Sequence, residues 1–217
     1  MTDNEDWMSH YREGFLVSIE GVDGAGKSTQ IGMLDRWMKA KGIAHTILKE
    51  PTSGPFGREI VHKVTSHEPI TPEEEARLFM KDRKEDVTKN ILPALHSGKI
   101  VVMDRYYHSN MAYQGARGLD PEKIREENEK FAPRPDLVIV LDIDPEKSLL
   151  RIVDHRKSPL DAFEKEDYLR RVREVFLKIG DQPNGVIIDA SEPAEKVHEA
   201  IIHAIMLKLP PHMFNHL

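Results

Sequence analysis

Short, mainly apolar runs alternate along this chain with longer stretches that have the periodicity of amphipathic helices. The apolar runs occupy residues 15–19, 43–48, 100–103, 137–141 and 186–188. Strands that are apolar throughout are buried on both faces, and strands that are separated by helices pair in parallel. The alternation therefore predicts an α/β fold in three layers, in which a five-stranded parallel sheet is flanked by helices.

Helices are expected between the apolar runs, at residues 27–41, 71–97, 106–114, 120–131, 145–157, 160–179 and 193–207. The clearest helix start is Thr71, an N-cap residue that is followed by Pro72 and by acidic residues that favour the positive end of the helix dipole. Ligands of such folds bind at the carboxyl ends of the strands. The residues that follow each apolar run are therefore the first candidates for a functional site.

Composition limits the classes of protein to consider. Among 217 residues, 31 are Lys or Arg and 37 are Asp or Glu, and the net charge of −6 gives no overall basic surface for a nucleic acid polymer or an anionic membrane. The absence of cysteine excludes disulfides, thiolate zinc sites and a cysteine nucleophile. No apolar run is long enough to span a membrane, and the N-terminal residues lack the pattern of a targeting peptide. We therefore expect one cytoplasmic domain over residues 1–217.

The first apolar run leads into the segment Gly21-Val22-Asp23-Gly24-Ala25-Gly26-Lys27-Ser28-Thr29. This segment fits the pattern G-x-x-x-x-G-K-[ST], in which glycines allow backbone N–H groups to surround phosphates. Lys27 would supply charge to the β- and γ-phosphates, and the Ser28 hydroxyl would ligate Mg²⁺. The following helix N-terminus adds its dipole. The position between the first strand and the first helix favours a nucleotide phosphate site over a simple glycine-rich turn.

Two further features at strand ends point to phosphate chemistry. The third apolar run ends in Asp104-Arg105, where an acid could join a Mg²⁺ shell and an arginine could hold a phosphate. Asp142 and Asp144 offer a similar pattern after the fourth run, but the arginine neighbour favours Asp104. A basic cluster, His155-Arg156-Lys157, is typical of a lid that closes over transferring phosphates, with a solvated turn as the alternative.

Phe79 and Arg83 lie four residues apart on one predicted helix and therefore share a face. An aromatic ring with a cation one turn away could stack a base and hold its phosphate. By spacing alone, the sequence favours a core phenylalanine beside a surface arginine.

Four segments, taken in order, resemble the thymidylate kinase (dTMP kinase) family of P-loop nucleoside monophosphate kinases. The segments are residues 21–29, Phe79 to Arg83, Asp104-Arg105-Tyr106 and Ala112-Tyr113-Gln114-Gly115. The resemblance extends over residues 13–207. It implies a P-loop kinase fold with a short lid, transfer of the ATP γ-phosphoryl group to dTMP with Mg²⁺, and a homodimer.

The resemblance also implies roles for individual residues. On the donor side, ATP would contact residues 21–29 and Arg151, and Mg²⁺ would be held by Ser28 and Asp104. On the acceptor side, Phe79 would stack the thymine and Tyr113 would favour a deoxyribose, and the other contacts would come from Lys49, Arg83, Arg105, Asn110 and Gln114. The residues expected to take part in catalysis are Lys27, Asp23, Arg105 and Arg156. The lid would span residues 151–163, and the acceptor-binding helices would lie within residues 55–97.

The chain departs from the family pattern in two segments. Where the family carries an arginine before the lid glutamate, this chain has Ala162, and we expect Arg156 to substitute. The segment after the second strand reads Lys49-Glu50-Pro51-Thr52-Ser53-Gly54 rather than Arg-Glu-Pro-Gly-Gly, and lysine lacks the bidentate fork of arginine. Two alternatives therefore stay open: a sister kinase for another nucleoside monophosphate such as dUMP, and a nucleotide-binding regulatory module without transfer activity.

Overall fold

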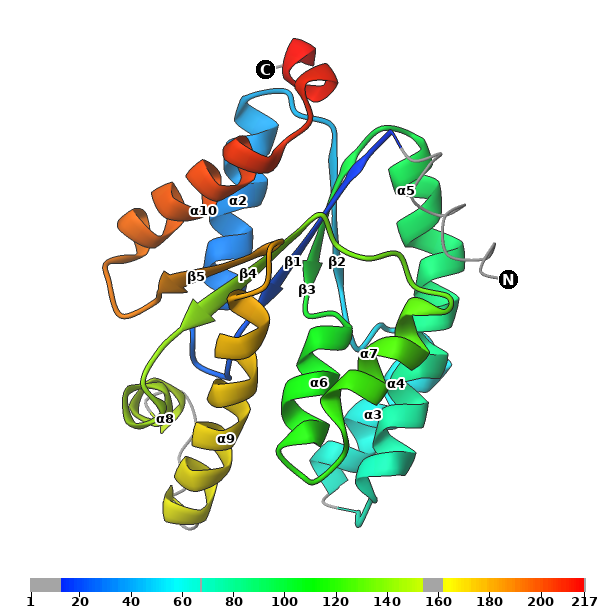
Figure 1. Ribbon diagram of the computed structural model, residues 1–217, viewed down its shortest axis with the longest axis vertical. Coiled ribbons are helices and arrows are strands. Elements are labelled where there is room, and N and C mark those ends of the chain that lie inside the picture. Colours follow the sequence, from blue (N-terminus) through cyan, green and yellow to red (C-terminus); the bar gives the residue numbers. More distant parts are fainter. Residues whose placement is uncertain (1–12, 67, 154–161, 217) are drawn as a thin grey trace.

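A five-stranded parallel sheet forms the centre of the molecule in the computed structural model, which describes residues 13–66, 68–153 and 162–216 (Figure 1). The strands are β1 Phe15–Glu20, β2 His45–Lys49, β3 Ile100–Asp104, β4 Leu137–Asp142 and β5 Gly185–Asp189, and their order in the sheet is β2-β3-β1-β4-β5. Every neighbouring pair is parallel. The predicted α/β class and the parallel sheet are confirmed.

Helices cover both faces of the sheet (Figure 1). On one face α2 and α10 pack against each other, and on the other face α9 contacts β4 and β5 while α5 contacts β3. Within the described part of the chain, no helix is both long and apolar enough to cross a membrane. The α-helices are α2 Lys27–Ala40, α3 Pro55–Ser66, α4 Pro72–Asp86, α5 Leu92–His96, α6 Tyr107–Gly115, α7 Pro121–Glu129, α8 Pro145–Val153, α9 Ala162–Gly180 and α10 Ala194–Lys208. A 3₁₀ helix, η2, follows at Pro211–His216.

The register of the strands brings the ends of β1, β2 and β3 to one edge of the sheet. Ile19 and Lys49 both lie opposite Asp104 in the parallel ladders. All residues of β1 and β3 are buried, so these two strands form a rigid base for the loops that follow them. The segments that follow the three strands therefore begin close together in space, although they are far apart in the sequence.

The predicted helix at residues 71–97 begins as expected but is not one regular helix. The Thr71 hydroxyl accepts a hydrogen bond from the Glu74 N–H, and the Glu74 carboxylate accepts one from the Thr71 N–H, so a capping box is present. A π-helical turn, η1 Val87–Ile91, separates α4 from α5. The interruption precedes Pro93, which has no N–H and whose ring would collide with the carbonyl group one turn earlier in a regular helix.

Candidate functional site

The loop between β1 and α2 has the conformation that its glycines allow. Gly21 has φ of 136°, and a Cβ atom at this position would lie 2.5 Å from the Leu141 carbonyl oxygen. Gly26 adopts the left-handed conformation at the N-cap of α2 and, lacking a side chain, donates or accepts no capping bond. The first N–H groups of α2 are therefore directed at the loop, where the helix dipole favours an anion.

Lys27 is buried beneath this loop. Its Nζ donates hydrogen bonds to the carbonyl oxygens of Gly21 at 2.9 Å and Val22 at 2.8 Å. Burial lowers the pKa of Lys27 to about 7, and the positive charge of Arg105 adds to this effect. The amino group of Lys27 is thus held at the loop by two backbone carbonyl groups.

A cavity of about 770 Å³ opens above the loop, and we call it the P-loop cavity. It is lined by the predicted residues Asp23 to Thr29, Asp104, Arg105 and Arg151. Lys49 also lines this cavity, where its Nζ lies 3.4 Å from the Asp104 carboxylate. Lys49, which the family resemblance assigned to the acceptor, therefore lines the cavity at the glycine-rich loop.

Arg151 contacts two segments of the chain that line the P-loop cavity. Its guanidinium donates to the carbonyl oxygens of Ala190 at 3.1 Å and Gly24 at 3.4 Å. Of the predicted lid at residues 151–163, the structure describes residues 151–153 at the end of α8 and residues 162–163 at the start of α9. Arg156 and the basic cluster at residues 155–157 lie outside the described residues.

A second cavity of about 320 Å³ adjoins the first, and we call it the aromatic cavity. Phe79, Tyr106, Tyr113 and Tyr168 contribute to its lining. Asp23 and Arg105 line both cavities, and their carboxylate and guanidinium groups form an ion pair at the boundary. The structure therefore places an arginine and an aspartate where the two cavities meet.

Arg83 lies at the base of the aromatic cavity and is only 1% exposed. Its Nε lies 2.9 Å from the Glu50 carboxylate, and a second guanidinium nitrogen also donates to this carboxylate. The guanidinium further donates to Asn128 at 2.6 Å and Asn110 at 2.7 Å. The interpretation from spacing alone, a surface arginine beside a core phenylalanine, is therefore wrong, because Arg83 is buried and Phe79 is partly exposed.

Glu50 and Asn128 are the members of this network that the sequence patterns did not reveal. Burial raises the pKa of the Glu50 carboxyl, and the Arg83 guanidinium opposes this shift. Because the two side chains form a bidentate contact, we regard Glu50 as the buried counter-ion of Arg83. The position of Glu50 directly after β2 was the one sequence signal that could have indicated its role.

The remaining predicted acceptor residues come from one helix. Asn110 and Gln114 lie one turn apart on α6, and the Asn110 amide donates to Gln114 at 3.0 Å. Tyr113 has its ring 5.2 Å from the Arg105 guanidinium carbon. Tyr168 of α9, which sequence reasoning missed, donates its hydroxyl to the Tyr113 carbonyl oxygen at 3.0 Å. The aromatic cavity is therefore bounded by α6 and α9 as well as by α4.

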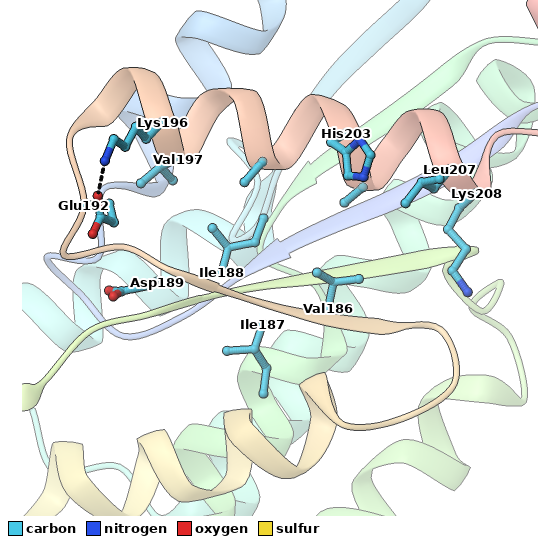
Figure 2. A pocket seen from close by; sticks show the side chains of 12 residues that line it. Val186, Ile187, Ile188, Asp189, Glu192, Lys196, Val197, His203, Leu207 and Lys208 are labelled. Atoms are coloured by element: carbon cyan, nitrogen blue, oxygen red, sulfur yellow. Dashed lines mark hydrogen bonds and ion pairs between the residues drawn. The ribbon is translucent and has the colours of Figure 1, made fainter.

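A third cavity of about 440 Å³ lies between the edge strand β5 and helix α10 (Figure 2). Apolar side chains such as Val186 and Ile188 face it, and a Glu192–Lys196 ion pair of 3.1 Å lies at one end. This cavity shares Glu192 and Val197 with the P-loop cavity. None of the predicted site residues that the structure describes lines it.

The strand order, the phosphate-binding loop at the end of β1 and the adjoining aromatic cavity define the chain as a P-loop nucleotide kinase. A family model described as thymidylate kinase matches residues 19–201. The chain therefore belongs to the thymidylate kinase family, and it is a nucleoside monophosphate kinase.

Individual relatives support the same family. The chain is 50% identical over 186 residues to a probable thymidylate kinase of Archaeoglobus fulgidus, a match that covers 86% of this chain and 92% of the relative. It is 43% identical over 199 residues to a thymidylate kinase of Akkermansia muciniphila, with 92% of this chain and 95% of the relative covered. The similarity thus extends over nearly the whole of both proteins.

Proposed function

We propose that this protein transfers the γ-phosphoryl group of ATP to dTMP, giving ADP and dTDP, a step towards dTTP. The observation that carries the proposal is that the P-loop cavity and the aromatic cavity meet at the Asp23–Arg105 ion pair. Two nucleotides bound with their phosphates towards this pair would bring donor and acceptor groups into contact. Two of the relatives are a probable thymidylate kinase and a thymidylate kinase, which supports dTMP as the acceptor.

On the donor side, the backbone of residues 21–29 would hold the triphosphate of ATP. Lys27 would exchange the carbonyl oxygens of Gly21 and Val22, to which it donates, for the β- and γ-phosphates. Arg151, at the edge of the same cavity, would contact the donor nucleotide. Because the chain supplies charge and position rather than a covalent intermediate, catalysis depends on the geometry of these groups.

The donor groups available in the P-loop cavity fit a Mg²⁺ ion that arrives with the nucleotide. Ser28 and Asp104 both line this cavity and offer the oxygen ligands that Mg²⁺ prefers. Among the described residues there is no cluster of three or more His, Asp or Glu side chains that could hold a metal by itself, which agrees with an ion bound mainly by phosphate and water. When bound, Mg²⁺ would neutralise charge on the phosphates.

On the acceptor side, we propose that Phe79 stacks the base and that Arg83, Asn110 and Gln114 hydrogen-bond to it. Tyr113 would pack against the sugar and disfavour a 2′-hydroxyl group. Arg105 would hold the acceptor phosphate, with Asp23 beside it. An oxygen of this phosphate would then attack the γ-phosphorus as the bond from the γ-phosphorus to the bridging oxygen of ADP breaks.

The decisive experiment measures ADP release from ATP and Mg²⁺ with dTMP, dUMP, UMP, CMP and AMP as separate acceptors. We expect the highest kcat/KM with dTMP. A higher kcat/KM with dUMP would instead favour the sister-kinase alternative, and no turnover with any acceptor would exclude the proposed function.

Four expectations stay predictions. These are the homodimer, the cytoplasmic location, the single domain over residues 1–217 and the substitution of Arg156 for the arginine that is missing at Ala162.

A further inference from the structure

Glu20, the last residue of β1, is a buried carboxylate that lines neither of the two substrate cavities. It is fully buried, with 0% exposure. Its oxygens accept hydrogen bonds from the Tyr106 N–H at 2.8 Å, the Ser109 hydroxyl at 2.6 Å and the Ser18 hydroxyl at 2.5 Å. Two of these donors belong to the segment that carries Arg105.

A directed chain of hydrogen bonds connects Glu20 to Arg105 through Ser109. The Arg105 guanidinium donates to the Ser109 hydroxyl oxygen at 3.0 Å. An arginine has only donors, so the single hydroxyl proton of Ser109 is free to be donated to Glu20. The polarity of this chain requires an acceptor at the position of Glu20.

The backbone at Arg105 is also held by Glu20. Arg105 has φ of 71°, a left-handed conformation that non-glycine residues adopt only when their surroundings impose it. The Arg105 N–H donates to the Ile19 carbonyl oxygen at 3.2 Å, and the next N–H, that of Tyr106, donates to Glu20. The end of β1 therefore holds the strained residue from both sides.

Electrostatics agree with this arrangement. Burial raises the pKa of the Glu20 carboxyl, whereas the hydrogen bonds from Ser109 and Ser18 and the charge of Arg105 lower it. The negative charge of Glu20 also raises the pKa of Lys27. The Glu20 carboxyl thus interacts electrostatically with Arg105 and Lys27, two basic side chains that line the P-loop cavity.

We propose that Glu20 is a positioning residue that holds Arg105 at the boundary between the two cavities, in the orientation that binds the acceptor phosphate. This inference rests on the proposed role of Arg105 as a phosphate ligand. A purely structural role, in which Glu20 only satisfies the buried Tyr106 N–H, predicts a different result when Glu20 is replaced.

Glu20→Gln separates the two roles. Glutamine keeps the shape of the side chain and can still accept the Tyr106 N–H. Its amide nitrogen, however, would donate to Ser109, so the Ser109 hydroxyl proton loses its acceptor at this position and the directed chain from Arg105 through Ser109 to residue 20 is broken. Ser109→Ala removes the same link without changing the buried charge, and it serves as the second variant if Glu20→Gln lowers the stability of the fold.

The test is calorimetric titration of the full-length wild-type protein and these variants with dTMP and, separately, with thymidine, which lacks the phosphate. For Glu20→Gln we expect binding of dTMP to weaken by about tenfold, because a charge-assisted contact is lost, and binding of thymidine to change by less than about twofold. Ser109→Ala should act in the same direction, and the double variant should be no weaker than the more affected single variant. The matched control is Ser18→Ala, which removes another bond to Glu20 that does not lead to Arg105, and it should leave both affinities unchanged.

Equal weakening of dTMP and thymidine would overturn the inference in favour of a structural role, as would dTMP binding that stays within twofold of the wild type. If the wild-type protein bound dTMP no more tightly than thymidine, the phosphate would contribute nothing to the affinity, and Arg105 would not be a phosphate ligand. That outcome would contradict the proposed acceptor as well as the inference, and the acceptor panel would identify it independently.

Discussion

The P-loop cavity and the aromatic cavity are built in different ways. In the P-loop cavity, polar groups come mainly from one continuous segment, and Lys27 is held by two backbone carbonyl oxygens. In the aromatic cavity, a buried Arg83–Glu50 ion pair and its amide partners come from four separated segments. The first cavity therefore presents groups that can exchange their partners, whereas the second is organised before any ligand binds.

This difference indicates how the two halves of the site relate to stability. Lys27 can leave its carbonyl partners for a phosphate without disturbing a buried side-chain network. Arg83 cannot lose Glu50 without leaving a charge unpaired in the interior, which is strongly unfavourable. We therefore expect substitutions in the aromatic cavity to affect folding, and substitutions in the P-loop cavity to affect mainly donor binding.

The largest expected effect is that of Glu50→Gln on stability. The substitution keeps the size of the side chain but removes the counter-ion of a guanidinium that is 1% exposed. We expect the free energy of unfolding at pH 7 to fall by about 3 kcal/mol, measured by urea denaturation.

Lys27→Met is the matched comparison on the other side of the site. It removes a buried charge that has no carboxylate within hydrogen-bonding distance among the described contacts, and it should change the free energy of unfolding by less than about 1 kcal/mol. Equal losses in the free energy of unfolding for Glu50→Gln and Lys27→Met would show that the two cavities do not differ in their contribution to stability.

The same contrast explains how much of the site could be predicted from the sequence. The glycine-rich loop and its place beside the P-loop cavity could be predicted, because the residue types of one contiguous segment determine the conformation of the loop. The partners of Arg83 could not be predicted in this way, because Glu50 and Asn128 lie 33 and 45 residues from it in the chain. They come together only in the folded protein, where α4 packs against α6 and α6 packs against α7.

The fold shows a similar division. The alternation of apolar runs and helical stretches was sufficient for the sheet and most helices. It did not predict the π-helical turn η1, because the effect of Pro93 depends on how the preceding turn packs against the core. Tyr168 was also missed, since an aromatic residue in a long charged helix carries no signal of the cavity that it reaches.

A prediction of intermediate size concerns the protonation of Lys27 in the P-loop cavity when ATP binds. Burial lowers the pKa of Lys27 from its ordinary value of 10.5 to about 7. At pH 8 most molecules therefore carry a neutral Lys27, and a bound triphosphate raises this pKa again. We expect ATP binding at pH 8 to take up close to one proton, and the dissociation constant to rise by up to about tenfold per pH unit above pH 7.

Titration calorimetry at pH 8 in two buffers with different heats of ionisation measures this uptake. Lys27→Met should abolish it, whereas Lys41→Met, at the other end of α2, should not change it. Proton uptake near zero in the wild-type protein would show that Lys27 is already charged before ATP binds, and it would contradict this prediction.

The lowered pKa of Lys27 also affects stability. Between pH 7 and 10.5 the unfolded chain binds more protons at Lys27 than the folded one, so the contribution of Lys27 to the free energy of unfolding increases as the pH rises.

The smallest expected effect tests whether the aromatic cavity is as rigid as the ion pair at its base. Tyr168→Phe removes only the hydroxyl that donates to the Tyr113 carbonyl oxygen at 3.0 Å and keeps the ring. Burial raises the pKa of Tyr168 to about 12, so the hydroxyl is a donor throughout the neutral range. Because one neutral hydrogen bond contributes about 1 kcal/mol, we expect kcat/KM for dTMP to fall by about threefold to fivefold.

Tyr107→Phe is the control for this last change. Tyr107, at the start of α6, donates its hydroxyl to Glu129 of α7 at 3.1 Å but lines neither cavity. It should leave kcat/KM unchanged. If Tyr168→Phe also had no effect, the side chains of α9 that line the aromatic cavity would be able to change their contacts when the nucleotide binds, as we propose for Lys27. In that case preorganisation would be confined to the buried network around Arg83, and the contrast between the two cavities would apply only to the base of the aromatic one.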